Sequence, residues 1–377
     1  MQQPLTPAQQ RLLLQTPDDD LLEVFKGRTR RWLRNEKAAL VKTVNPKELM
    51  TVDLEKSKTN ARLRVAASQY KTALAEADEL RVALDTALRL QDNFKMGTFS
   101  IKTQKNTHEA TAVALASDWH CEEPVDPNQV NGLNAFNLVV FETRAKAFFA
   151  NLIELVRKER AAVRINNLVL WLGGDFITGN IHDDTSFQNQ LGPIDALIHA
   201  QQTIGNGINT VLKALPDLKL IVPCSVGNHS RITKKQMIKS ERENSLEVLM
   251  YRSLAQFFEG RAQFILPQGY HTYLDVHGYV LRFHHGHNIQ YQGGIGGITV
   301  PVNKAIAGWN RSRTAHLDCF GHFHQRFDGG NFLANGSLIG YNEFALAIKA
   351  SYEPPQQQFA LIDSRHGKTV VAPILLT

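Results

Sequence analysis

Residues 168–175 read Leu-Val-Leu-Trp-Leu-Gly-Gly-Asp, and residues 220–229 follow the same plan with Leu-Ile-Val-Pro-Cys-Ser-Val-Gly-Asn-His. In each stretch a mainly apolar run ends in glycine and is followed at once by polar side chains. Such a run is typical of a strand that is buried on both faces of a parallel sheet. Beyond residue 106 these runs alternate with longer amphipathic segments. The alternation predicts an α/β fold in which functional side chains lie at the carboxyl ends of strands.

The same pattern predicts the individual elements of this region. Strands are predicted over 111–116, 168–172, 218–226, 279–284 and 316–320, and helices over 136–160, 188–215 and 242–258. The glycine-rich segment 293–297 does not follow a strand, so we interpret it as a turn before a helix that ends near Trp309. From Phe332 onward, the short apolar runs at 336–340, 344–350, 358–364 and 369–376 predict antiparallel strands.

Length and composition indicate a globular chain of two domains. The chain has 377 residues, of which 43% are hydrophobic and 21% charged, enough apolar material for a sizeable core. No apolar run reaches the roughly 18 residues that a membrane helix needs, and the first residues lack the pattern of a secretory signal. The cysteines, Cys121, Cys224 and Cys319, are widely spaced, which argues against a disulfide framework. We therefore expect a cytoplasmic protein without a membrane partner.

The first hundred residues differ from the rest in charge and periodicity. Residues 1–100 are predicted to be a helical, basic region, with 17 basic and 13 acidic side chains, and eight of the basic ones fall within 26–47. A basic third helix fits a helix-turn-helix on nucleic acid or a solvated bundle. Residues 47–96 contain neither glycine nor proline, and a heptad seam from Leu63 to Ala87 predicts one long helix. This helix either forms a homo-oligomer or lies against the α/β region of its own chain, and 97–106 is the predicted linker.

Five short clusters of metal-binding residue types follow the predicted strands. They are Asp118-Trp119-His120, Gly174-Asp175, Gly227-Asn228-His229, His284-His285-Gly286-His287 and Gly321-His322-Phe323-His324. Any one of them alone is more often turn chemistry than a metal site, but five in order, each ending an apolar strand, are hard to obtain by chance. Mixed aspartate, histidine and asparagine ligands suit divalent metals such as Mn, Fe or Zn.

In this order the clusters match D-x-H, GD, GNH, H and GHxH, and the chain resembles the calcineurin-like metallophosphoesterase superfamily over residues 105–377. It also looks like phage or prophage metallophosphoesterases with an N-terminal helical extension. The resemblance implies a four-layer αββα sandwich, with two packed sheets flanked by helices, as the catalytic domain. It also implies two divalent metal ions, with Mn²⁺ as the first choice and Fe, Zn, Ni or Mg as alternatives.

The resemblance further implies a role for each matching residue. Asp118, His120 and His324 would bind the first metal, and Asp175 would bridge the two metals. Asn228, His285 and His322 would complete the second metal site. His229 would not bind metal, but would protonate the leaving oxygen or stabilise the phosphoryl transition state.

The sequence departs from the family pattern in two places. Ser230 follows His229 where many members have a carboxylate, so the partner of His229 is expected elsewhere. The fourth cluster offers three histidines, of which we select His285 as the ligand because it directly precedes Gly286. His284 should point the other way from the strand.

Substrate contacts are predicted more loosely. The candidates are Asn180, His182, Arg231 and His287, with Lys234, Lys235, Lys239 and Arg242 as further basic residues after His229. For the segment around Asn180 and His182, a hydrogen-bonded loop is an equal alternative. For the charged segment, the alternative is a solvated face.

The expected activity is hydrolysis of a phosphate ester by a metal-bound hydroxide. The leading hypothesis is a phosphodiesterase or nuclease, because a basic appendage suits a nucleic-acid substrate. Alternatives are a phosphomonoesterase and a phosphodiesterase for cyclic nucleotides or small molecules. A non-catalytic interaction module on the same fold is a further alternative, although no candidate ligand is missing.

Overall fold

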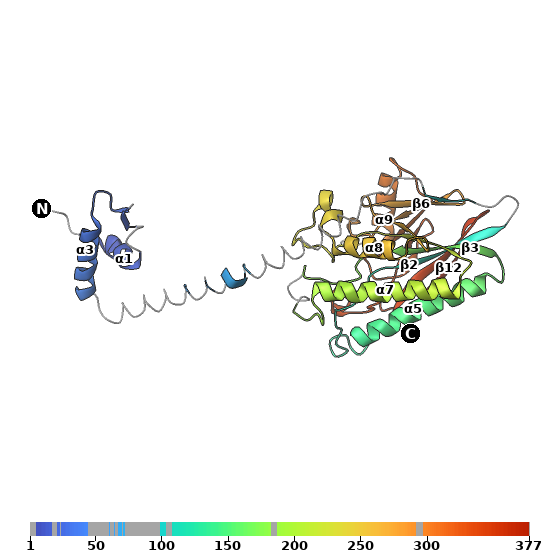
Figure 1. Cartoon of the computed structure of the whole chain (residues 1–377), viewed down its shortest axis with the longest axis horizontal. Helices are drawn as coiled ribbons and strands as arrows, with labels where there is room; N and C mark the ends of the chain where they lie inside the picture. Colours follow the sequence, from blue (N-terminus) through green and yellow to red (C-terminus); the bar gives the residue numbers. More distant parts are fainter. Residues whose placement is uncertain are drawn as a thin grey trace. The chain divides into compact units, whose positions relative to one another are not determined.

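The structure is a computed structural model that describes residues 5–16, 21–22, 24–43, 99–102, 108–181, 187–291 and 297–376, with isolated positions between 60 and 71. The chain divides into two compact units, Met1–Arg89 and Leu90–Thr377, which are coloured along the sequence in Figure 1. Within the described residues, no helix is both long enough and apolar enough to cross a membrane.

The first unit is a small helical assembly. It contains α1 (Pro7–Gln15), α3 (Arg30–Thr43) and helical positions at Leu21, Leu22 and Val24. A capping box at Thr6 begins α1, and the buried core is formed by Leu13, Leu21 and Leu33. The long helix predicted over 47–96, and with it the predicted oligomer contact, falls largely outside the described residues.

The second unit contains two six-stranded sheets. The first sheet has the order β12 (Gly367–Leu375), β11 (Gln356–Asp363), β2 (Glu109–Ala116), β3 (Arg164–Leu172), β4 (Lys219–Pro223) and β5 (Gln263–Ile265). Its strands β2 to β5 are parallel, whereas β11 is antiparallel to both of its neighbours. The second sheet has the order β1 (Ser100–Ile101), β6 (Thr272–Val276), β7 (Tyr279–Phe283), β8 (Leu317–Phe320), β10 (Phe332–Ala334) and β9 (Phe327–Asp328). Here β7, β8 and β10 are parallel.

The two sheets share one apolar core. Alternate residues of both sheets contribute to it, among them Val113 and Leu115 of β2 and Leu281 and Phe283 of β7. The rings of Trp171 and Phe283 stack across the interface, with their centroids 6.0 Å apart. The sheets are therefore packed face to face.

Helices cover the outer faces of the sheets. Figure 1 shows α5 (Leu138–Glu159), α7 (Pro193–Ala214) and α8 (Leu246–Phe257) along the first sheet, where α5 contacts β12 and α8 contacts β5. On the second sheet, Val302 and Ile306 of α9 (Thr299–Trp309) pack against Phe320 and Phe332. The short elements η1 (Ile238–Ser240), η2 (Arg242–Asn244) and α10 (Glu343–Ala347) lie in connections.

The predicted α/β class is confirmed, as are the five predicted strands and the helices, with ends shifted by a few residues. Three predictions are wrong. The predicted linker at 97–106 contains β1, which pairs with β6 and places Ile101 in the core. Residues 344–350, predicted as a strand, include α10, because the Asn342 side chain caps a helix by accepting a hydrogen bond from the Ala345 N–H. The run at 336–340 lies outside the strands as well.

Candidate metal centre

The five predicted clusters follow the carboxyl ends of β2, β3, β4, β7 and β8. Because β2, β3 and β4 are parallel neighbours, and β7 and β8 are as well, their carboxyl ends meet at common sheet edges. Backbone hydrogen bonds join the loops. The Asp118 N–H donates to the Gly174 carbonyl (3.0 Å), and the His322 N–H donates to the Asp118 carboxylate (2.9 Å). The His229 N–H donates to Asp175 Oδ1 (2.8 Å).

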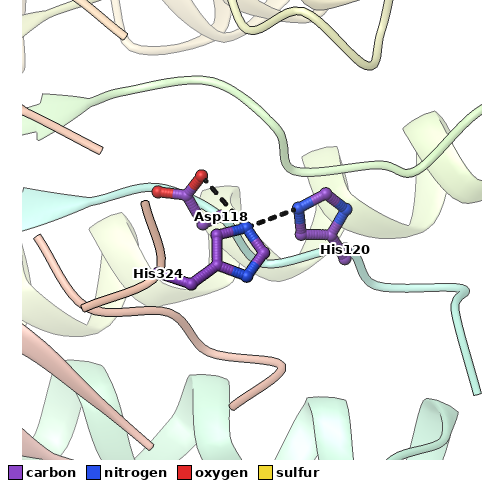
Figure 2. A group of neighbouring side chains, drawn as sticks. All are labelled: Asp118, His120 and His324. Carbon is purple, nitrogen blue, oxygen red and sulfur yellow. Dashed lines mark hydrogen bonds and ion pairs between the residues drawn. The ribbon is translucent and has the colours of Figure 1, made fainter. Parts of the chain in front are cut away.

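Asp118, His120 and His324 form the first group of potential ligands. Their donor atoms all lie within 4.8 Å of one another, and Figure 2 shows the three side chains converging on one point. The Nε2 atoms of His120 and His324 are 3.3 Å apart, and Nε2 of His324 is 3.5 Å from Asp118 Oδ1. These are distances at which three donor atoms surround a single cation.

The hydrogen bonds of Thr178 determine the tautomer of His120. The hydroxyl of Thr178 donates to the Glu123 carboxylate (2.8 Å), so it must accept its contact with His120 Nδ1 (2.9 Å) from an Nδ1–H. Nε2 of the neutral imidazole then carries a lone pair directed at the group. This is how a hydrogen bond outside the metal site orients a ligand histidine.

Asp175, His285 and His322 form a second group of the same size. His285 Nδ1 donates to the Gly173 carbonyl (2.8 Å), while its Nε2 faces Asp175 Oδ2 (2.8 Å) and Asn228 Oδ1 (3.1 Å). Both ring nitrogens therefore face oxygen acceptors, which requires a positive charge at Nε2. In the metal-free protein a proton on Nε2 supplies this charge. A metal ion bound by Nε2, Asp175 and Asn228 would take the place of that proton.

Asp175 also belongs to a third group, with His120 and His229. It thus lies within ligand distance of residues on both sides of the site, the position that a bridging carboxylate needs. His229 Nδ1 donates to the Thr178 carbonyl (3.1 Å), which leaves Nε2 for the site. This carbonyl is the partner of His229 that the sequence left open, because Ser230 pairs with Ser245 instead (2.8 Å).

Burial and the mutual charges of the site set the protonation states of its candidate ligands. Burial raises the pKa of Asp118 to about 7, assisted by the carboxylate of Asp175. Burial lowers the pKa of His324 to about 4 and holds the pKa of His120 well below its usual value, so both imidazoles are neutral. Burial alone would lower the pKa of His285, but Asp175 outweighs it and raises that pKa to about 10.

The backbone of the site adopts a sparsely populated conformation. Eight non-glycine residues of the described chain have positive φ, and five of them are candidate ligands: Asp118 (58°), His120 (47°), Asp175 (54°), His322 (72°) and His324 (56°). Such conformations cost free energy and cluster at active sites, where surrounding contacts enforce them. The strain therefore coincides with the residues that the motifs select.

Two glycines allow the ligand loops to approach. A Cβ atom at Gly227 would lie 2.2 Å from Asp175 Oδ1, and one at Gly321 would lie 2.3 Å from Asp118 Oδ2. Any side chain at either position would displace a carboxylate of the site. Steric exclusion thus explains why the GNH and GHxH motifs begin with glycine.

The remaining predicted residues lie around these groups. His284 points away from them, toward Asp318 (3.4 Å) and Trp309, while His287 Nε2 contacts Glu241 Oε1 (2.7 Å) beside His285. The Arg231 guanidinium donates to the backbone carbonyls of Asn228, Thr233 and Lys234, so it organises its own loop. Asn180 is exposed, and His182 lies outside the described residues.

Two buried glutamates in the site were not predicted. The carboxylate of Glu247 accepts from the N–H groups of Phe176 (2.8 Å) and Gly227 (3.0 Å), and Glu122 accepts from Thr178 and Gly179 (both 2.8 Å). Glu247 had a detectable signal, because its spacing from Tyr251 and Leu254 places it on the apolar face of α8. A carboxylate on such a face indicates a buried partner.

No protein-family model matches this chain, and none of the curated proteins compared with it matches either.

Proposed function

We propose that the chain is a dinuclear metal-dependent phosphoesterase with a metallophosphoesterase-type αββα sandwich, and that it hydrolyses phosphodiesters. The observation that carries the proposal is the position of Asp175. Its carboxylate is within ligand distance of His120 on one side and of His285 and His322 on the other. Two metals that share one carboxylate are typical of enzymes that displace an alcohol from phosphate.

The donor set fits two divalent ions. Asp118, His120 and His324 would hold one ion, and Asn228, His285 and His322 would hold the other, with Asp175 between them. Such ions lower the pKa of a bound water and neutralise the phosphate oxygens. Mn²⁺ is the proposed metal.

His229 is proposed to donate a proton to the leaving oxygen. Its Nδ1–H is engaged by the Thr178 carbonyl, so the ring is fixed with Nε2 toward His120 and Asp175. A proton on Nε2 is then available at the group's edge, where a phosphate ester oxygen would lie. The role requires no covalent intermediate on the protein.

Exposed basic side chains favour a polyanionic substrate. Lys234, Lys235 and Lys239 are exposed in the loop that follows His229, and α3 of the first unit exposes Arg31, Arg34 and Lys42. Cations placed in this way bind phosphate backbones through counterion release. We therefore propose nucleic acid as the substrate class.

The test combines metal analysis with hydrolysis of bis(p-nitrophenyl) phosphate in Mn²⁺. We expect about two metals per chain. Asp175→Asn should retain fewer metals and lose about a hundredfold or more in rate, since residues that only support ligands already cost 10–100-fold. Asp217→Asn, an exposed aspartate paired with Arg160, is the matched control and should change neither quantity. An active preparation with one metal or none would disprove the dinuclear proposal.

A further inference from the structure

An apolar cavity opens directly beside the first group of potential ligands. It has a volume of about 100 Å³ and is lined by His322 and His324, which also belong to the metal centre. Its other walls come from the loop 337–342, from α10 and from the segment 348–355. A molecule in this cavity would therefore touch the same histidines that a metal would bind.

Hydrogen bonds tie each wall of the cavity to the metal centre. The Leu338 N–H donates to the Asp118 carbonyl (3.1 Å), and the Gln325 side chain, next to His324, donates to the Ser351 carbonyl (2.9 Å). The Asn342 side chain, which caps α10, donates to the carboxylate of Glu123 (3.0 Å). Glu123 in turn accepts from the Thr178 hydroxyl that orients His120. The cavity thus belongs structurally to the site.

The lining residues are suited to a flat ring. Phe323, Tyr341 and Phe344 are aromatic, and Pro354 and Pro355 add apolar surface. Phe344 is 69% exposed, on a helix that is fixed by the Asn342 cap at one end and by Lys349 (φ 62°) at the other. Ile348, which also lines the cavity, is 58% exposed, and neighbouring exposed apolar side chains of this kind mark ligand-binding sites. Aromatic side chains bind nucleic-acid bases by stacking.

The charged side chains around the cavity indicate how a ligand would be oriented in it. The one acidic side chain among the lining residues is Glu353, whose Oε1 accepts from the Arg326 N–H (2.8 Å). A carboxylate repels a phosphate but accepts a hydrogen bond from a base amino or imino group. The phosphate would lie on the histidine side and the ring in the cavity.

We propose that this cavity binds the nucleobase of the nucleoside whose phosphate lies at the metal centre. The proposal rests on the proposed function and adds the substrate group that the enzyme recognises next to the reacting phosphate. Tyr341 and Phe344 are the residues that contact the base.

The test uses two esters with the same leaving group in Mn²⁺: the p-nitrophenyl ester of thymidine monophosphate and methyl p-nitrophenyl phosphate. The wild-type chain should prefer the nucleoside ester in kcat/KM by roughly tenfold, the range of one base–aromatic stack. In Tyr341→Ala and Phe344→Ala this ratio should fall toward one. Phe257→Ala is the matched control, because Phe257 is also exposed (62%) and lies outside the cavity. Equal efficiency of the wild-type chain on both esters would overturn the proposal while leaving the phosphoesterase intact.

Binding separates this proposal from the proposed function. Calorimetric titration with thymidine monophosphate and with methyl phosphate measures recognition without turnover. If neither ester is hydrolysed, the proposed function fails. The cavity proposal still holds in that case if thymidine monophosphate binds more tightly than methyl phosphate and Phe344→Ala removes the difference. Equal affinity for the two phosphates would overturn it.

Discussion

Glu247 places a fully buried carboxylate between the two loops that carry Asp175 and Asn228. Each of its oxygens accepts one backbone N–H, from Phe176 and from Gly227. The pKa of Glu247 is raised to about 7, by burial first and by Asp175 second, so both amide hydrogen bonds work against a substantial desolvation cost. By accepting one hydrogen bond from each loop, the Glu247 carboxylate holds the two loops at a fixed separation.

Replacing Glu247 by glutamine therefore tests a positioning role. The amide would place an NH₂ donor against one of the two N–H groups, so one hydrogen bond must be lost. We expect Glu247→Gln to weaken Mn²⁺ binding by about 10–100-fold, as loss of a supporting residue does. Glu259→Gln, on an exposed side chain, is the control. A variant that loses thermal stability but keeps its metal affinity would contradict the prediction.

His229 should show its role through the leaving group. Because it is assigned to proton donation, His229→Ala should keep its metal content while losing rate. The loss should be greatest for esters of poorly acidic alcohols and smallest for p-nitrophenyl esters, which need little protonation. Rates across a series of leaving groups, with metal analysis of each preparation, check this. An equal loss of rate across the series would exclude proton donation and leave His229 with electrostatic stabilisation of the transition state as its role.

Elements were predictable where the pattern is local. The strand at 168–172 is a continuous apolar run, and the ligand motifs directly follow such runs, so both are visible in the sequence. The three-residue β5 offers too little pattern, and the helix α10 depends on its Asn342 cap. The roles of Glu122 and Glu247 depend on N–H groups 56 and 71 residues away, which no short motif encodes. The face-to-face pairing of the sheets came from the family resemblance, not from periodicity.

The loops that follow the parallel strands β7 and β8 carry three of the candidate ligand histidines, and the two strands share a buried ion pair. Arg282 donates to both oxygens of Asp318 (2.6 and 2.9 Å), and both side chains are fully buried. Removing Arg282 leaves the buried Asp318 carboxylate without its two guanidinium hydrogen bonds and with only His284 (3.4 Å) beside it, so Arg282→Met should lower the free energy of unfolding by about 3–5 kcal/mol. The double variant Arg282→Met/Asp318→Leu should lose less of its free energy of unfolding than the single variant, because no buried charge is left without its partner. Denaturant unfolding of both variants checks this.

Arg313→Met provides the control for that experiment. Arg313 is an exposed arginine that stacks on Tyr273 at 3.9 Å, and an exposed cation–π contact contributes about 0.5–1 kcal/mol. If Arg282→Met lowers the free energy of unfolding no more than Arg313→Met does, the Arg282–Asp318 ion pair does not stabilise the edge of the sheet next to the histidines.

At the scale of the whole chain, we expect hydrolysis and the binding of long nucleic acid to belong to different units. All five ligand clusters lie in Leu90–Thr377, while α3, the most basic of the described helices, lies in Met1–Arg89. Residues 1–100 carry a net charge of +4 of the chain's +6. Substrate length should therefore separate the two contributions, because a small ester carries one phosphate, whereas a long nucleic acid carries many phosphates that basic side chains can bind.

Substituting Arg31, Arg34 and Lys42 by glutamine in the full chain tests this division. Each phosphate contact contributes about −0.9 to the slope of log affinity against log salt for duplex DNA. The triple variant should bind duplex DNA more weakly, with a slope shallower by roughly 2–3, whereas the hydrolysis of a small diester that we propose for the other unit should continue. Lys158, Lys213 and Lys304, also exposed, provide a control with the same change of charge. If the control variant shifts the slope as much as the α3 variant, the net charge of the chain binds DNA and α3 has no specific part.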